Sequence, residues 1–383
     1  MYVTRFLSTY QRDPSALSLP PPEGPNSGIL VIQDEEAQPT CCFGLCNSDQ
    51  VRDLPFPQNT NLRVEYSTGT GQHRHVSVDR VIFIPVLNLP LSSNQYYCIP
   101  RKGKHKGEAY RSSTEEDMTT CCFCRHITDF KPQTCDPHDI YQQFEIRRRN
   151  SSGYAANSVA PDGFPPYFLR RKGWQVTFTT PTQFQLTEAS GLDKALRARL
   201  PDSKFPLSEN NSPAVVVGKW YCPFIFIKEA TLEHQMDSSR YYEMTLEQRW
   251  ERIFCCENDG NQGNVDVDVV IETEAVEVCG KAGMYDENSV DGMVWFKSLD
   301  KTASVGLSLG VVERMKWEEV RFGWSGEKEV RVKRVDEFGG EGHQWKRFGC
   351  YVLVERFVLK RMNGSLVLTN DFKHPQRIIT KWE

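Results

Sequence analysis

The sequence predicts a strand-dominated α+β protein. We expect a C-terminal antiparallel sheet or β-sandwich with one packed helix, preceded by an irregular, β-rich N-terminal domain. Two observations lead to this prediction. Apolar and polar residues alternate along several C-terminal segments, which is the pattern of half-buried antiparallel strands. Short β-branched and aromatic segments in the N-terminal part are bounded by Gly, Pro, Asn or Ser, as short strands between loops are.

Chain length and composition predict two domains. With 383 residues the chain exceeds the usual size of one hydrophobic core, and its 39% hydrophobic and 11% aromatic residues are typical of folded proteins. Residues 163–166 read Gly-Phe-Pro-Pro, which suits neither a helix nor a central strand. We therefore predict a Cys- and Pro-rich β domain over residues 1–167 and an antiparallel β domain over residues 168–383.

The C-terminal part contains the clearest strand patterns. Residues 265–272 alternate between apolar and acidic side chains, apart from the additional apolar residue Val270. Residues 242–251 alternate in the same way, but Leu246, Trp250 and Phe254 also have helical spacing, so strand and helix both remain open there. Asn363 and Gly364 stand between two apolar runs and predict a β-hairpin with a type I′ turn. Further strands are expected around residues 330–332 and over residues 348–359.

The N-terminal part contains short strands and one helix. The predicted strands cover residues 29–32, 62–66, 81–86 and 96–99. Asp136 as N-cap, Pro137 at the first helical position, and Ile140 and Phe144 four residues apart predict a helix that ends near Arg149. In the C-terminal domain, short helices are expected over residues 192–200 and 311–320.

Charge and cysteine content indicate which partners and which cellular compartment to expect. A net charge of -4 and a pI near 6.1 give no global attraction for polyanions, so nucleic-acid binding is not favoured. The N-terminus lacks an apolar secretory segment, and no run of eighteen apolar residues occurs. We expect a protein of the cytoplasm or nucleus, not secreted and without a membrane span, in which the 13 cysteines are free thiols or metal ligands.

One group of cysteines and histidines has the composition of a metal site. Residues 121–138 supply four thiols and two imidazoles, the soft donors that a tetrahedral zinc ion takes. We predict Cys122, Cys124, Cys135 and His138 as the ligands of a structural zinc ion. The alternative is that Cys122 and Cys124 are small apolar residues on a buried strand edge and that the histidines are surface residues.

No segment predicts a catalytic or cofactor-binding residue. Ser308 stands in a Gly-Leu-Ser-Leu-Gly string before a predicted helix, which matches a nucleophile elbow. The flanking segments alternate like antiparallel strands, whereas an α/β-hydrolase needs apolar parallel strands. Asp371 with His374 would keep the order of a triad, but a long polar chain offers such pairs by chance. The basic run at residues 101–106 could contact phosphate, but solvated loop charge is the favoured explanation.

Several strings resemble an uncharacterised land-plant family that is defined by domain of unknown function 1262. They are YVTR at residues 2–5, PPPEGPNSG at 20–28, DEE at 34–36, CCFGLC at 41–46, LPFPQ at 54–58, DIYQQ at 139–143, GFPP at 163–166, VGKWY at 217–221, and residues 350–368. The resemblance implies a plant source and a role in stress or defence responses. It implies no reaction, cofactor or catalytic residue.

These observations favour a non-enzymatic protein. We interpret the chain as an interaction or ligand-binding protein of plant stress or defence responses, whose partner is another protein or a small molecule. The alternative is a zinc-stabilised protein, with or without enzymatic activity, that uses the cluster at residues 121–138. Metal content separates the two hypotheses.

Overall fold

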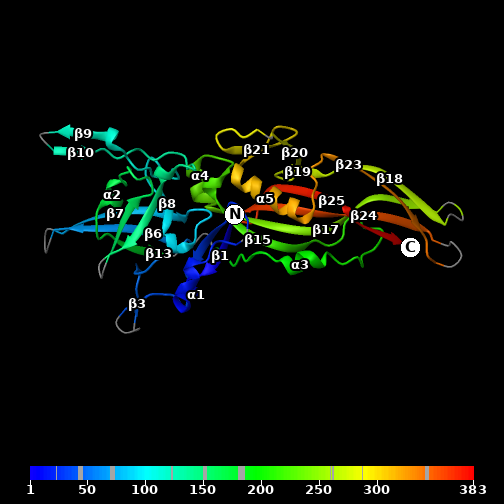
Figure 1. Ribbon diagram of the computed structural model, residues 1–383, viewed down its shortest axis with the longest axis horizontal. Coiled ribbons are helices and arrows are strands. Elements are labelled where there is room, and N and C mark those ends of the chain that lie inside the picture. Colours follow the sequence, from blue (N-terminus) through cyan, green and yellow to red (C-terminus); the bar gives the residue numbers. More distant parts are fainter. Residues whose placement is uncertain are drawn as a thin grey trace. The chain divides into compact units, whose positions relative to one another are not determined.

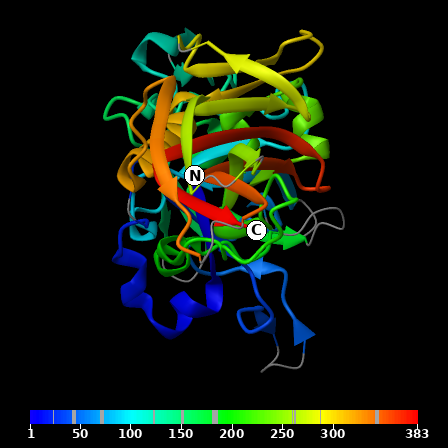
Figure 2. The same ribbon diagram turned by 90° about the vertical axis from the view of Figure 1, so that its right-hand side faces the viewer.

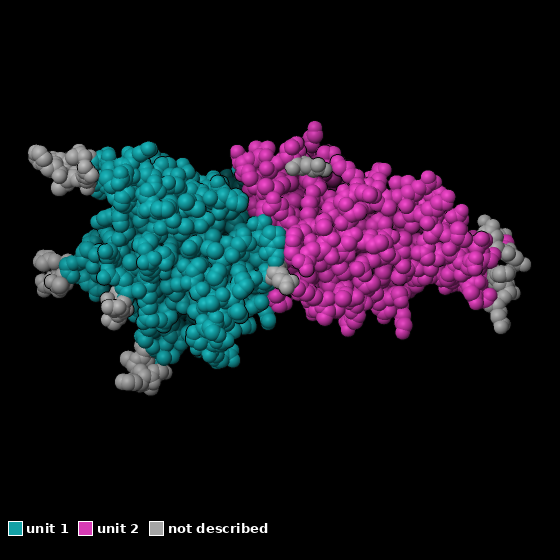
Figure 3. Space-filling model, viewed as in Figure 1, with its two compact units in different colours: residues 1–189, 221–242 teal, residues 190–220, 243–383 magenta. Residues whose placement is uncertain are grey.

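The computed structural model divides into two compact units (Figure 3). Unit 1 comprises Met1–Ala189 and Tyr221–Tyr242, and unit 2 comprises Ser190–Trp220 and Glu243–Glu383. The structure describes residues 1–22, 24–41, 46–69, 74–121, 124–149, 153–179, 186–258, 260, 263–286, 288–340 and 345–383. A division into compact units does not test whether residues 1–167 and 168–383 fold as separate domains. That division into domains stays a prediction.

Unit 1 is built on a seven-stranded antiparallel sheet (Figure 1). The strand order is β12-β11-β8-β7-β6-β13-β5. One face of this sheet carries an aromatic core that includes Phe56, Tyr96, Tyr154 and Trp174. The strands are β5 (Gln50–Val51), β6 (Asn61–Thr68), β7 (His75–Pro85), β8 (Gln95–Pro100), β11 (Gln143–Arg148), β12 (Tyr154–Ser158) and β13 (Gln175–Thr179).

Smaller elements complete unit 1. Strands β1 (Tyr2–Phe6) and β2 (Gly28–Ile32) pair in parallel. Two short antiparallel pairs are formed by β3 (Thr40–Cys41) with β4 (Cys46–Asn47) and by β9 (Met118–Cys121) with β10 (Cys124–Ile127). The remaining elements are α1 (Leu7–Arg12), α2 (Tyr167–Arg170), β16 (Ile227–Lys228) and α4 (Leu232–Ser238).

Unit 2 is built on long neighbouring strands. Their order is β22-β21-β20-β19-β25-β24-β17-β15, and β14 pairs with β15. Strands β15 and β17 also have residues in unit 1. The strands are β14 (Gly191–Leu192), β15 (Val215–Pro223), β17 (Tyr241–Glu257), β19 (Glu274–Val278), β20 (Lys281–Tyr285), β21 (Met293–Ser298), β22 (Ser304–Ser308), β24 (Arg347–Arg361) and β25 (Leu366–Trp382).

Side chains of β24 point alternately to the two faces of the sheet, and other elements cover both faces. On one face, Val352 and Val354 pack against Ile271 and Val332 of a two-stranded ribbon. This ribbon consists of β18 (Asn264–Glu272) and β23 (Glu329–Glu337), and Figure 2 shows β23 in orange near the red end of β25. The other face carries the helices α3 (Lys194–Arg199) and α5 (Leu309–Phe322).

The structure confirms a strand-dominated α+β fold. The segment at residues 242–251 is a strand, and the short helices predicted at 192–200 and 311–320 are α3 and α5. In the part of the chain that the structure describes, no helix combines the length and apolar character needed to cross a membrane.

The helix predicted from Asp136 to Arg149 is wrong. Asp139 caps a single 3-10 turn at Ile140–Gln142 through its side chain, and strand β11 follows at once. Phe144 and Ile146 are both fully buried and alternate with polar residues, whereas Ile140 is exposed. The four-residue spacing of Ile140 and Phe144 was therefore not a helical face, and strand pairing with β8 and β12 decides the conformation.

The hairpin predicted at Asn363 and Gly364 is confirmed, but its turn differs. Strands β24 and β25 pair from Phe348 with Trp382 to Lys360 with Leu366. Gly364 has a φ of 83°, whereas Asn363 is absent from the residues with positive φ. A type I′ turn needs positive φ at both central residues, so the connection is instead a longer loop with glycine in the left-handed conformation. The register shift between Leu359 and Lys360 accommodates the extra residue.

Candidate functional site

The most unusual feature of unit 2 is a glutamate in the middle of its sheet. Glu355 lies in β24 and is fully buried. It points to the helix-covered face, because it alternates with Val352 and Val354 on the ribbon side and shares the direction of Leu353. Burying an ionised carboxylate is costly unless hydrogen bonds and an opposite charge compensate it. The neighbouring elements supply both.

Arg197 of α3 is the counter-ion of Glu355. Its Nε donates to Oε1 of Glu355 at 2.9 Å, and its Nη2 donates to Oε2, so the guanidinium grips both carboxylate oxygens. Gln248 of β17 adds a hydrogen bond from Nε2 to Oε1 of Glu355 at 2.8 Å. The Arg197 guanidinium also lies 4.2 Å from the centroid of the Phe322 ring of α5. The pair therefore ties α3 to two strands of the sheet and to α5.

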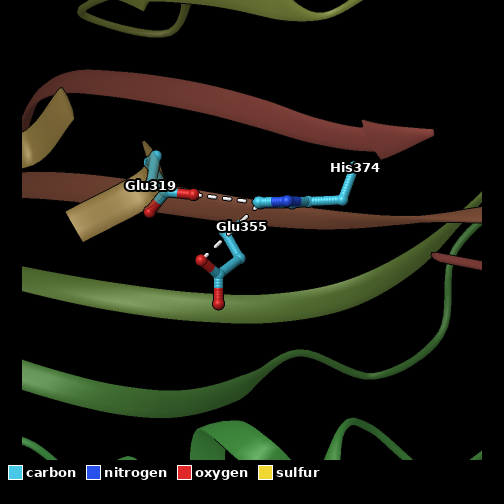
Figure 4. Close-up of side chains that lie close together, drawn as sticks. All are labelled: Glu319, Glu355 and His374. Atoms are coloured by element: carbon cyan, nitrogen blue, oxygen red, sulfur yellow. Dashed lines mark hydrogen bonds and ion pairs between the residues drawn. The ribbon is translucent and has the colours of Figure 1, made fainter. Parts of the chain in front are cut away.

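Helix α5 adds two acidic residues to this cluster. Glu318 receives a hydrogen bond from Arg314 at 2.6 Å and one from Arg197 at 3.4 Å. Glu319 accepts from Arg197 at 3.4 Å and lies 3.0 Å from Nε2 of His374 in β25. Figure 4 shows that the carboxyl groups of Glu319 and Glu355 both lie beside the His374 ring. All these side chains are buried, so α5 is attached to the sheet through polar contacts.

The environment sets different protonation states within the cluster. Burial acts to raise the pKa of Glu355, but the hydrogen bonds and charge of Arg197 outweigh burial and lower it, so this group is ionised. Burial, followed by the charge of Glu355, holds the pKa of Glu319 well above its usual value, so Glu319 keeps its proton. Burial lowers the pKa of His374 to about 4, which leaves the ring neutral at pH 7.

The hydrogen bonds of His374 agree with a neutral ring. Nε2 of Gln376 lies 3.4 Å from Nδ1 of His374 and donates to it, so the ring proton belongs on Nε2. From there it is donated to a Glu319 oxygen. At the centre of the network, the ionised carboxylate of Glu355, the protonated carboxyl group of Glu319, the neutral ring of His374 and the Arg197 guanidinium lie together, and the pair formed by Glu318 and Arg314 is bonded to Arg197.

Glu319, Glu355 and His374 are also the residue types of a metal site. Their ligand atoms all lie within 4.8 Å of one another. Carboxylates and imidazole suit several divalent cations. However, Arg197 already supplies positive charge to both oxygens of Glu355. The other two possible metal ligands, Glu319 and His374, are hydrogen-bonded to each other. The geometry therefore favours a closed ion network that holds α3 and α5 on the sheet.

A solvent-accessible pocket lies beside Lys316 of α5. It has a volume of about 580 Å³, and its lining includes Glu274, Met284, Tyr285, Leu299, Lys316 and Trp324. Lys316 donates to the Tyr285 hydroxyl at 2.8 Å, and this hydroxyl donates to Glu274 at 2.9 Å. Exposed Met284 and Leu299 add apolar surface. Glu272, Glu327, Glu329 and Lys328 complete the charged part of the lining, so the pocket combines apolar surface with convergent polar groups, as small-ligand sites do.

The structure describes only some of the predicted zinc ligands. Cys122 lies outside the described residues, and Cys124 belongs to β10, where its backbone is described. Cys135 is half-buried, and burial raises the pKa of its thiol. His138 is exposed, and its backbone N–H donates to Asp136. The zinc site stays a prediction.

Three smaller sequence interpretations can be compared with the structure. Ser308 ends β22 and precedes α5, but its φ of -58° and ψ of 144° are ordinary extended values, without the strained turn of a nucleophile elbow. Asp371 accepts hydrogen bonds from Arg249 and Arg356, so it serves a different set of partners from His374. Cys46 is disulfide-bonded, which corrects the expectation of a free thiol there.

Comparison with known proteins gives limited information. Residues 23–123 match the family model described as a protein of unknown function (DUF1262), which confirms the domain of unknown function in this part of unit 1. No curated protein matches the chain. A solved structure, "Crystal structure of Cry35Ab1", is similar with a TM-score of 0.48 at 13% sequence identity, over 85% of this chain and 90% of that chain. A likeness of this size carries no argument about function.

The two central glutamates should lose different amounts of stability on the same substitution. Glu319→Gln replaces a protonated carboxyl by a neutral amide and should cost about 1 kcal/mol or less. Glu355→Gln leaves the Arg197 guanidinium buried without its carboxylate and should cost roughly 3–5 kcal/mol. Urea unfolding at pH 7, with exposed Glu313→Gln on the same helix as control, measures both. Equal losses for the two variants would contradict the assigned protonation states.

His374 should make stability depend on acid pH. Its folded-state pKa of about 4 is below the unfolded value of 6.5, so its contribution is complete above pH 6.5 and is lost as pH falls toward 4. The loss amounts to roughly 3 kcal/mol. Glu319 acts oppositely, because its raised pKa gives stability that is present below about pH 4.5 and lost as pH rises through the folded value.

Removal of the Glu319 titration isolates the His374 contribution. Urea unfolding midpoints of Glu319→Gln should fall between pH 6.5 and 4, and the double variant with His374→Gln should fall less. Exposed His234→Gln serves as the control and should keep the steeper dependence. Identical pH profiles for the single and double variants would show that His374 titrates normally in the folded protein.

The predicted zinc site is tested by elemental analysis. If Cys122, Cys124, Cys135 and His138 bind zinc, protein purified without chelators should contain nearly one zinc ion per chain. The Cys122→Ser, Cys135→Ser double variant should lose it, whereas a Cys255→Ser, Cys279→Ser variant at two exposed free cysteines should not. Folded wild-type protein without zinc rejects the prediction.

Proposed function

We propose that the protein is a non-enzymatic ligand-binding protein and that the pocket beside Tyr285 and Lys316 is its binding site. The observation that carries this proposal is the convergence of Lys316, Tyr285 and Glu274 in a cavity of about 580 Å³ whose lining also includes the apolar side chains of Met284 and Leu299. The other concentration of ionisable groups, around Glu355, is buried and internally bonded. It offers no open position to a substrate.

The lining of the pocket indicates the chemistry of its ligand. Met284 and Leu299 are 61% and 59% exposed and offer apolar contact to an aliphatic or aromatic body. The Lys316 ammonium has three donors, one of which is used by Tyr285, so an acceptor on the ligand can bind there. Glu272, Glu327 and Glu329 also line the cavity and would repel an anion. A small, neutral, amphipathic molecule with a carbonyl or ether oxygen fits these conditions.

The biological setting belongs to the same proposal. The resemblance of strings along nearly the whole chain to an uncharacterised land-plant family supports a plant source and a role in stress or defence responses. A ligand-binding role is compatible with that setting, because a neutral amphipathic metabolite or signal would suit the pocket. The proposed localisation is the cytoplasm or nucleus.

Nile red is a suitable probe because it is neutral, amphipathic and more fluorescent in apolar surroundings. Wild-type protein should bind it saturably, and Lys316→Met should weaken binding roughly tenfold through the lost charge-assisted hydrogen bond. Ala282→Trp should fill the cavity and abolish binding. Lys346→Met, at an exposed lysine outside the lining, should bind like wild type.

Two results would contradict the proposal. Unchanged Nile red binding by both Lys316→Met and Ala282→Trp would place the binding elsewhere. Turnover of a substrate in a broad hydrolase screen, with loss of activity in Ser308→Ala, would show that the protein is an enzyme.

A further inference from the structure

Three arginines form a row across the sheet of unit 1. Arg63 of β6 and Arg80 of β7 are direct cross-strand partners. The backbone N–H of Arg101 donates to the carbonyl of Arg80 at 2.8 Å, so Arg101 continues the row next to the end of β8. Leu62 and Val81, which alternate with Arg63 and Arg80, are buried in the core. The arginines therefore point to the opposite face of the sheet.

This arrangement is unfavourable in the free protein. Like charges directly opposite each other on neighbouring strands destabilise a sheet. None of the carboxylates in the described residues forms an ion pair with Arg63, Arg80 or Arg101. Glu65, two residues along β6, instead accepts a hydrogen bond from Thr177 at 2.8 Å. The repulsion between the three guanidinium groups thus has no counter-ion among these side chains.

A fourth arginine and a buried donor add to the row. Arg240 is held near it by a hydrogen bond from Nη1 to Oδ1 of Asn61, the residue at the start of β6. Nε of Arg101 is buried and has no hydrogen-bond partner among the described residues. Burial, together with the charges of Arg240, Arg80 and Arg63, lowers the pKa of Arg101 to about 10. The charges of the other arginines therefore act on Arg101.

We propose that Arg63, Arg80 and Arg101 form a binding site for a small molecule that carries phosphate groups. Guanidinium groups bind phosphate through paired N–H donors, and a bound anion removes the repulsion along the row. Neighbouring strands are about 4.8 Å apart, so the row spans roughly 10 Å. This length fits two or three linked phosphate groups. The net charge of -4 gives no long-range attraction for a nucleic acid.

This site is independent of the pocket beside Lys316, because all its arginines belong to unit 1. It also gives a specific role to Arg101, the first residue of the basic run at residues 101–106. Lys106 of that run is engaged by Asp237 at 2.5 Å. The arginine row, and not the whole basic run, is therefore the expected contact with the phosphate groups.

Inorganic tripolyphosphate is the probe for this site. Isothermal titration of the full chain at low salt should show one site, with affinity reduced roughly tenfold or more in Arg63→Gln and in Arg80→Gln. Arg80→Lys keeps the charge but loses the paired donors, and should bind with intermediate affinity. Arg74→Gln, at an exposed arginine just before β7, should bind like wild type.

A stability measurement tests the same row without ligand. Because Arg80 faces Arg63, Arg80→Gln should raise the urea midpoint of the free protein, whereas tripolyphosphate should raise the midpoint of wild type more than that of the variant. Affinities within twofold of wild type for Arg63→Gln and Arg80→Gln, or a lower midpoint for free Arg80→Gln, overturn the proposal. Tighter binding of an oligothymidylate than of tripolyphosphate overturns the choice of a small ligand.

Discussion

The buried carboxylate of Glu355 constrains the whole helix-covered face of unit 2. A charge at that depth is tolerated only with a matched cation and saturated hydrogen bonds. Arg197 brings the cation from α3, Gln248 brings a donor from β17, and Glu319 brings a protonated carboxyl group from α5. The positions of both helices therefore follow from one strand residue. Apolar packing alone would allow α3 and α5 more freedom to slide, because hydrophobic contacts have little directionality.

The network around Glu355 stabilises the fold and is distinct from the surfaces at which we expect ligands to bind. Groups with strongly shifted pKa values often mark active sites, but structural ion networks shift pKa values as well. Around Glu355, each shifted group has a partner inside the network. The pocket beside Lys316 and the arginine row differ, because Lys316 lines an open cavity and the described residues form no ion pair with Arg63, Arg80 or Arg101. We therefore expect ligand binding at these two surfaces, and a structural role for the network.

The sequence predicted the strands of unit 2 through the alternation of apolar and polar residues. This alternation arises because one face of a sheet is buried. It also predicted the short helices that correspond to α3 and α5. It failed at residues 136–149, where Asp136 and Pro137 resembled a helix start but Asp139 caps only a 3-10 turn. The network was not predicted, because Arg197, Glu319 and Glu355 are far apart in the chain. A signal was present, since Glu355 stands at an inward position of an otherwise apolar strand and needs a partner.

The most direct test of the network is the ionisation state of Glu319. Protein labelled with carbon-13 at the glutamate side-chain carboxyl carbon, with the Glu319 signal assigned by Glu319→Gln, reports protonation through the chemical shift across the pH range. The account predicts that Glu319 in the folded protein remains protonated at pH 7 while Glu355 is ionised. A Glu319 signal that titrates near pH 4.5, like an exposed glutamate, would contradict it.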